Sequence, residues 1–212
     1  IGETSDIKKR TIQHLTVDPR TRSDWENLAI SDSSKMYVIG HEHFNKSLTL
    51  DIENKLMLYM SSIENVDAVY NRRTNQQNDY FTSHEVDKIF SKVWRGLQKK
   101  NKELFPVEQI IRDSAIFKAS PFHKLTEEQI RTKDFITLRI MQALTKEETG
   151  QLILVTGEAG SGKTVLMSSL FYELNQLSKD DPENLIFKDT KNFLLVNHEQ
   201  QLKVYQQIAT KL

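Results

Sequence analysis

The residues with the clearest chemistry form one glycine-rich stretch. It reads Gly157-Glu158-Ala159-Gly160-Ser161-Gly162-Lys163-Thr164 and fits the phosphate-binding pattern G-x-x-x-x-G-K-[ST]. Anionic phosphates need several N–H donors close together with no side chain in the way, and glycines let the backbone curl to provide them. We expect Lys163 to contact the β and γ phosphates of ATP and the Thr164 hydroxyl to ligate Mg²⁺.

The elements expected around this stretch are those of a strand–loop–helix unit. An apolar run at 151–156 predicts a strand before it, and leucines spaced along 165–177 predict a helix after it. A second apolar run at 192–196 predicts another strand, and Asn197 is expected to cap a final helix. This order of elements predicts the start of a parallel α/β sheet.

Hydrolysis of ATP requires more than a phosphate-binding loop. An acidic residue near the end of another strand must organise Mg²⁺ and the attacking water. Glu199 follows the second predicted strand, but its position after Asn197 favours a place inside the final helix. We therefore expect the chain to bind nucleotide and expect the acidic strand to lie beyond Leu212.

The whole-chain composition excludes some classes of protein. Lysine plus arginine equals aspartate plus glutamate, at 29 each, so net charge gives no argument for nucleic acid or membrane. There is no cysteine, which excludes disulfides and a thiol nucleophile. Apolar runs are far shorter than the ~20 residues that span a bilayer, so we expect a cytoplasmic protein. Because residue 1 is isoleucine, we expect a fragment of a longer protein.

The chain divides into two parts with a connector between them. Pro106 and Pro121 flank a short expected helix, so we place a connector at 101–124, after a first domain at 1–100 and before a second at 125–212. In the first part, periodic apolar residues predict helices, and short apolar runs predict strands at 35–40 and 66–70. The predicted helices of this part cover residues 6–15, 25–30, 48–60 and 86–97.

The second part resembles a family of bacterial superfamily-1-like helicases. The resemblance is carried by residues 117–129, by the glycine-rich stretch and by residues 193–200, and it points to the Schlafen group-3 DNA/RNA helicase type. It implies a RecA-like α/β domain and ATP-driven work on DNA or RNA. Gln129 then has two open roles: it resembles a glutamine that reads the adenine edge in such helicases, and with Thr126 it also has the spacing of a capping box.

The first part resembles a GIY-YIG nuclease domain entered midway. Ile1-Gly2 looks like the end of the YIG strand, and Arg10 then falls where that family has its catalytic arginine. His14 matches a histidine one turn later, Glu53 matches the metal-binding glutamate, and Asn71 is a weaker candidate for the late asparagine. The resemblance implies a small α+β domain in which a Glu53-bound Mg²⁺ and Arg10 assist phosphodiester cleavage.

Two functions follow from these resemblances. The first is an ATP-binding, helicase-like P-loop NTPase with an attached GIY-YIG endonuclease domain that acts on DNA or RNA. The second is a nucleotide-gated module that binds nucleic acid or protein through a nuclease domain without catalytic activity. A small-molecule kinase shares the P-loop but needs a lid and an acceptor site, for which the sequence offers no candidate.

Overall fold

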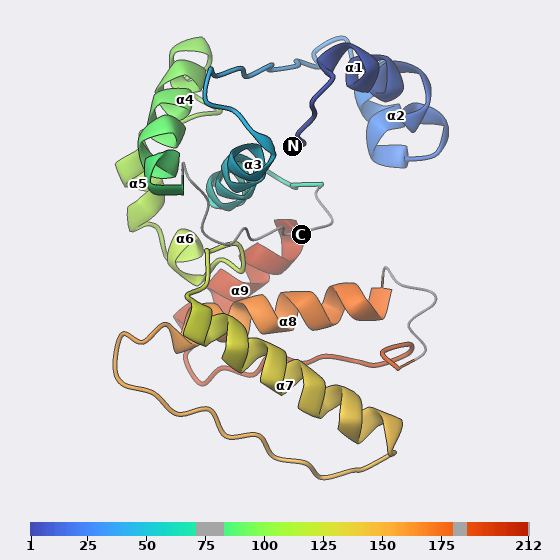
Figure 1. The fold of residues 1–212 in the computed structure, drawn as a ribbon, viewed down its shortest axis with the longest axis vertical. Coiled ribbons are helices and arrows are strands. Elements are labelled where there is room, and N and C mark those ends of the chain that lie inside the picture. Colours follow the sequence, from blue (N-terminus) through green and yellow to red (C-terminus); the bar gives the residue numbers. More distant parts are fainter. Residues whose placement is uncertain (71–82, 180–185, 212) are drawn as a thin grey trace. The chain divides into compact units, whose positions relative to one another are not determined.

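The computed structural model describes residues 1–70, 83–179 and 186–211. Over these ranges the chain forms helices and short 3-10 turns joined by coil, and none of these helices is long and apolar enough to cross a membrane (Figure 1). The elements are α1 (Ile7–Thr16), η1 (Asp18–Arg20), α2 (Ser23–Ile30), α3 (Lys46–Ser61), η2 (Ser83–Glu85), α4 (Val86–Lys100), α5 (Glu108–Asp113), α6 (Ala115–Ala119), α7 (Glu127–Thr145), α8 (Lys163–Lys179) and α9 (Glu199–Lys211).

The chain folds as two compact units. Unit 1 consists of residues 1–56 and 75–105, and unit 2 consists of residues 57–74 and 106–212. The helix α3 contributes its first part to unit 1 and its last turns to unit 2. The predicted functional domains at 1–100 and 125–212, with a connector at 101–124, stay a prediction.

The core of unit 1 is built on the amphipathic helix α4. Its apolar face buries Phe90 and Trp94 completely, and the Trp94 ring meets Phe105 edge-on at 5.5 Å between ring centroids. From α3, Leu48 is fully buried and Lys55 forms an ion pair of 2.6 Å with Asp87 of α4. Because aromatic residues bury large apolar areas, this cluster contributes strongly to the stability of unit 1.

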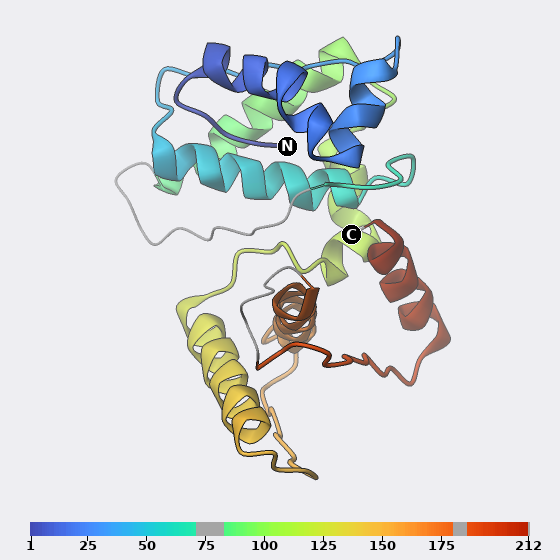
Figure 2. The same ribbon diagram turned by 90° about the vertical axis from the view of Figure 1, so that its right-hand side faces the viewer.

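The core of unit 2 lies where α7 packs against α8. Ile136 of α7 meets Leu170 and Leu174 of α8, and Phe187, only 1% exposed, covers them from the segment before α9. Lys133 of α7 pairs with Glu173 of α8 beside this cluster. Figure 1 shows α7 next to α8, and Figure 2 shows the same pair with α8 seen nearly end-on, so the glycine-rich stretch that ends at the start of α8 is attached to a packed helix pair.

The last helix, α9, is fixed at its carboxyl end to the segment that follows α3. The Lys211 amine donates to the Ile63 carbonyl, and Val69 N–H donates to the Lys211 carbonyl at 2.9 Å. Burial lowers the pKa of Lys211, although the nearby Glu64 and Asp67 carboxylates act in the opposite direction. The position of α9 within unit 2 is therefore held by backbone as well as side-chain bonds.

The predicted α/β fold is wrong: no strand is present in the described residues, so these form neither a RecA-like parallel sheet nor an α+β GIY-YIG-like domain. The stretches 151–156 and 192–196 are coil, with Leu152 88% exposed and Leu195 89% exposed. An apolar run becomes a strand only where a neighbouring backbone accepts and donates its ladder bonds. No described segment forms such a ladder along these two runs, or along 35–40 and 66–70, where the Val69 bond to Lys211 is a single contact.

Candidate phosphate-binding site

The glycine-rich stretch forms a loop that leads directly into α8. The helix begins at Lys163, and Leu166 N–H donates to the Gly162 carbonyl at 2.9 Å. The first N–H groups of a helix have no partner within the helix and carry a partial positive charge. The loop therefore ends at a helix terminus that is suited to an anion.

Two glycines give this loop its shape. Gly160 has a φ of 80° and Gly162 a φ of 81°, in the left-handed region that side-chain-bearing residues rarely adopt. Between them, Ser161 N–H donates to the Glu158 carbonyl at 3.3 Å, which closes a turn across Ala159. Of the three glycines in this stretch, two thus occupy positions where the backbone conformation requires glycine.

Lys163 folds back over the loop. Its Nζ donates to the Gly157 carbonyl at 2.8 Å and to the Glu158 carbonyl at 2.7 Å. Hydrogen bonds from an ammonium to a phosphate oxygen are stronger than those to a neutral carbonyl, so a phosphate can compete for this amine. The ammonium is therefore held beside the loop backbone, where an incoming phosphate would need it.

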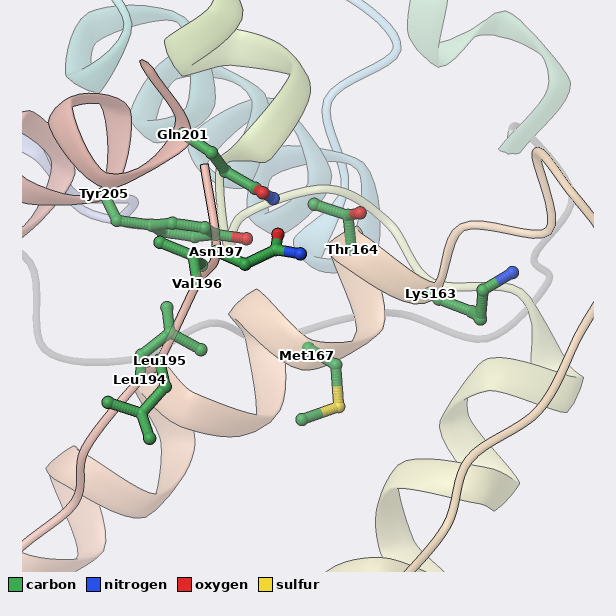
Figure 3. Close-up of a pocket in the computed structure, with 9 residues that line it drawn as sticks. All are labelled: Lys163, Thr164, Met167, Leu194, Leu195, Val196, Asn197, Gln201 and Tyr205. Carbon is green, nitrogen blue, oxygen red and sulfur yellow. The ribbon is translucent and has the colours of Figure 1, made fainter. Parts of the chain in front are cut away.

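The side chain of Thr164 lies on the opposite side from the Lys163 amine. It lines a cavity of about 580 Å³ together with Asn197, Gln201 and Tyr205, and the Lys163 amine is directed away from these three residues (Figure 3). Hydroxyl and amide oxygens are hard ligands of the kind that Mg²⁺ accepts, usually with water in its other positions. The residues present thus fit a Mg²⁺ ion held by Thr164.

Gln129 joins α7 to the loop. Its Oε1 accepts from Thr126 N–H at 3.0 Å, and Thr126 Oγ1 accepts from Gln129 N–H at 3.3 Å, so the predicted capping box is confirmed. Its Nε2 donates to the Ser161 carbonyl at 3.0 Å. Sequence reasoning missed this bond, because no local pattern reports a contact across 32 positions. The role of Gln129 in reading adenine stays a prediction.

Two predicted nuclease residues, Arg10 and His14, meet in a network around Asp18. Arg10 Nη1 donates to Gln13 Oε1 at 2.9 Å, and Gln13 Nε2 donates to Asp18 Oδ1 at 3.2 Å. His14 Nδ1 lies 2.5 Å from Asp18 Oδ2, and its ring stacks on Trp25 at 3.8 Å. His14 therefore joins α1 to η1 and α2, and Arg10 lies beside the same network, while the predicted catalytic roles of Arg10 and His14 stay predictions.

The charge of Asp18 is stabilised within this network. Burial raises the pKa of its carboxyl, but hydrogen bonds from His14 and Gln13 and the charges of His14 and Arg10 outweigh burial and lower it. Asp18 was not singled out from the sequence, although its spacing of four from His14 is a usable signal.

The other predicted nuclease residues do not join this network. Glu53 lies half-buried on α3, and Asn71 lies outside the described residues. Within the described ranges, no group of three or more histidine and acidic residues is placed to hold a metal ion. The metal role of Glu53 stays untested.

Comparison with known proteins bears on the second half of the chain. Residues 150–212 match the family described as Schlafen group 3, DNA/RNA helicase domain. A Saccharomyces cerevisiae protein described as uncharacterized protein YPL245W is 34% identical over 80 residues, which is 37% of this chain and 18% of that protein. The chain thus spans less than a fifth of the relative's length, and no solved structure matches.

The family match supports the helicase part of the sequence interpretation, at the level of the family and for residues 150–212. The comparisons give no support for a GIY-YIG nuclease domain or a bacterial source.

Proposed function

We propose that residues 157–164 bind the triphosphate of ATP with Mg²⁺, as the nucleotide-binding part of a helicase-like NTPase that acts on DNA or RNA. The observation that carries this proposal is the loop itself. Left-handed Gly160 and Gly162 shape it, the start of α8 closes it, and the Lys163 amine lies against its backbone. Loop N–H groups, a helix terminus and an ammonium are the three features that recognise phosphate.

Each site residue has a distinct part in this proposal. The loop backbone from Gly157 to Gly162 supplies N–H donors, and Lys163 exchanges its two carbonyl acceptors for β- and γ-phosphate oxygens. The Thr164 hydroxyl holds Mg²⁺, which neutralises the phosphates and orients them. Gln129 holds the loop at Ser161 from the side.

A second function, nucleotide-gated binding without turnover, is favoured by one feature of the cavity beside Thr164. None of the described residues that line it is aspartate or glutamate. Glu199, the acid weighed from the sequence, lies in the first turn of α9 and pairs with Lys203 at 2.9 Å. If no acidic residue elsewhere in the protein organised the attacking water, the site would bind ATP and leave it intact.

Calorimetric titration of the chain with Mg·ATP tests the proposed site. Lys163→Ala should weaken binding roughly tenfold or more, because a hydrogen bond to a charged group contributes about 1.5–3 kcal/mol. Lys146→Ala is the matched control, since Lys146 is an exposed lysine of unit 2 whose contact with Glu148 is long, at 3.9 Å. Equal affinities for Lys163→Ala and the control would refute the site.

The nucleic-acid part of the proposal needs a separate measurement. Fluorescence anisotropy with labelled single-stranded DNA and RNA, with and without Mg·ATP, should show an affinity that depends on the nucleotide. ATP hydrolysis measured in the same samples separates the two functions: turnover stimulated by nucleic acid supports the NTPase, and nucleotide-dependent binding without turnover supports the gated module.

A further inference from the structure

The first turn of α9 faces the start of α8 across the cavity beside Thr164. Asn197, just before α9, and Gln201, within it, line this cavity of about 580 Å³ with Thr164. Figure 3 shows their amide groups directed toward the region of the Thr164 side chain. All of these residues belong to unit 2, so the cavity is internal to one compact unit.

A hydrogen-bonded chain fixes this arrangement. Ser168 Oγ donates to the Thr164 carbonyl at 2.9 Å and lies 3.1 Å from the Tyr205 hydroxyl. Tyr205 and Gln201 are four residues apart on α9 and therefore share a helix face. The contact between Tyr205 and Ser168 thus holds the face of α9 that carries Gln201 next to the first turns of α8, where Thr164 lies.

The side-chain amides of Asn197 and Gln201 are available to a ligand. Within the described part of the chain, no hydrogen bond joins the side chain of Asn197 or Gln201 to another residue, and Asn197 is exposed to solvent. A primary amide offers two N–H donors for phosphate oxygens and a carbonyl acceptor for a metal-bound water. On the other side, Met167, Leu194 and Val196 line the cavity with apolar surface.

We propose that Asn197 and Gln201 recognise the third phosphate of the nucleotide and the hydrated Mg²⁺ beside it, so that the site prefers ATP to ADP. This inference rests on the proposed function of the loop. The loop amides can hold the phosphates that ATP and ADP share, and Lys163 is expected to reach the β- and γ-phosphates. Asn197 and Gln201 line the same cavity as Thr164, the expected Mg²⁺ ligand, so they are placed to add contacts to the γ-phosphate that ADP lacks.

Paired affinity measurements test the inference. The dissociation constants of Mg·ADP and of Mg·AMPPNP, an ATP analogue that is not hydrolysed, are measured by calorimetry for the wild type, Asn197→Ala and Gln201→Ala. Each variant should weaken AMPPNP binding about tenfold and leave ADP binding unchanged.

The control is Gln207→Ala, which removes an exposed glutamine of α9 that does not line the cavity and should change neither affinity. Unchanged AMPPNP binding, or equal weakening of AMPPNP and ADP, would overturn the inference while leaving the loop assignment intact. Variants that weaken binding of a single-stranded oligonucleotide at an unchanged AMPPNP-to-ADP ratio would also overturn it. If the wild type bound neither nucleotide, the proposed function itself would fail.

Discussion

The two left-handed glycines of the loop offer a matched pair of substitutions. Gly160 and Gly162 have φ values of 80° and 81°, so alanine meets the same backbone penalty at both positions. A Cβ at Gly160 would have no atom within 4 Å, whereas a Cβ at Gly162 would lie 2.3 Å from Gln129 Nε2. The difference between the two variants therefore isolates the contact between Gln129 and the loop.

The expected losses of Mg·ATP affinity follow from the backbone penalty and from the displacement of the Gln129 side chain. A left-handed conformation costs a residue with a side chain roughly 1–2 kcal/mol. Because nucleotide binding must restore the loop, Gly160→Ala should weaken Mg·ATP binding roughly 5- to 30-fold. In Gly162→Ala the Gln129 side chain must also leave the Ser161 carbonyl, which adds about 1 kcal/mol. The total loss for Gly162→Ala is then roughly 30- to 150-fold.

Calorimetric titration with Mg·ATP measures both losses, and a double-mutant cycle identifies their origin. In a Gln129→Ala background the side chain that a Cβ would meet is gone, so Gly162→Ala should cost no more than Gly160→Ala. Equal losses for the two single variants would refute the contact. Wild-type affinity in both would refute the loop conformation as the one that binds nucleotide.

Three further predictions concern Gln129 and unit 1. Gln129→Glu keeps an oxygen for Thr126 N–H but loses the donor to Ser161, so calorimetry should show Mg·ATP binding weakened about tenfold at an unchanged melting temperature. Asp18→Asn should lose about 1.5–3 kcal/mol of unfolding free energy at pH 7 in urea titrations. The pKa of Asp18 is lower in the folded protein, so its stabilising effect is complete above the unfolded pKa near 3.9 and is lost as pH falls through the folded pKa. The unfolding free energies of the wild type and Asp18→Asn should therefore converge in acid. A difference that stays constant with pH would contradict the role given to the Asp18 charge. Trp94→Ala should cost about 3–5 kcal/mol by the same titration, and a loss below about 1 kcal/mol would show that α4 does not carry the core.

Helical periodicity in the sequence predicted much of the secondary structure. The apolar face of α4 and the leucines of α8 appear where the 3.6-residue pattern places them, because a helix satisfies its own backbone and needs only one packed face. The strand predictions were wrong because a strand, unlike a helix, cannot satisfy its own backbone hydrogen bonds. A strand at 151–156 depends on a partner elsewhere in the chain, and no local pattern reports whether that partner is present.

The candidate site could be predicted from the sequence only where its residues are contiguous. The glycines and Lys163 lie within one stretch of eight residues, and their spacing predicts a phosphate-binding loop, which stays a prediction. The hydrogen bond from Gln129 to Ser161 joins distant segments, and so does the cavity that Asn197 and Gln201 line with Thr164. Both features could be recognised only in the three-dimensional structure. In unit 1, the hydrogen bonds of Arg10 and His14 around Asp18 were not predicted from the sequence, and the catalytic roles of the two residues stay a prediction.

Amide hydrogen exchange of the loop tests the central claim most directly. With saturating Mg·ATP, amides of residues 157–164 should exchange more slowly, because phosphate oxygens accept hydrogen bonds from them. Adenosine, which lacks phosphates, should leave their exchange unchanged, and Lys163→Ala should reduce the protection by Mg·ATP. Unaltered exchange across 157–164 in the wild type with bound Mg·ATP, or protection confined to other segments, would contradict the assignment of this loop to the triphosphate.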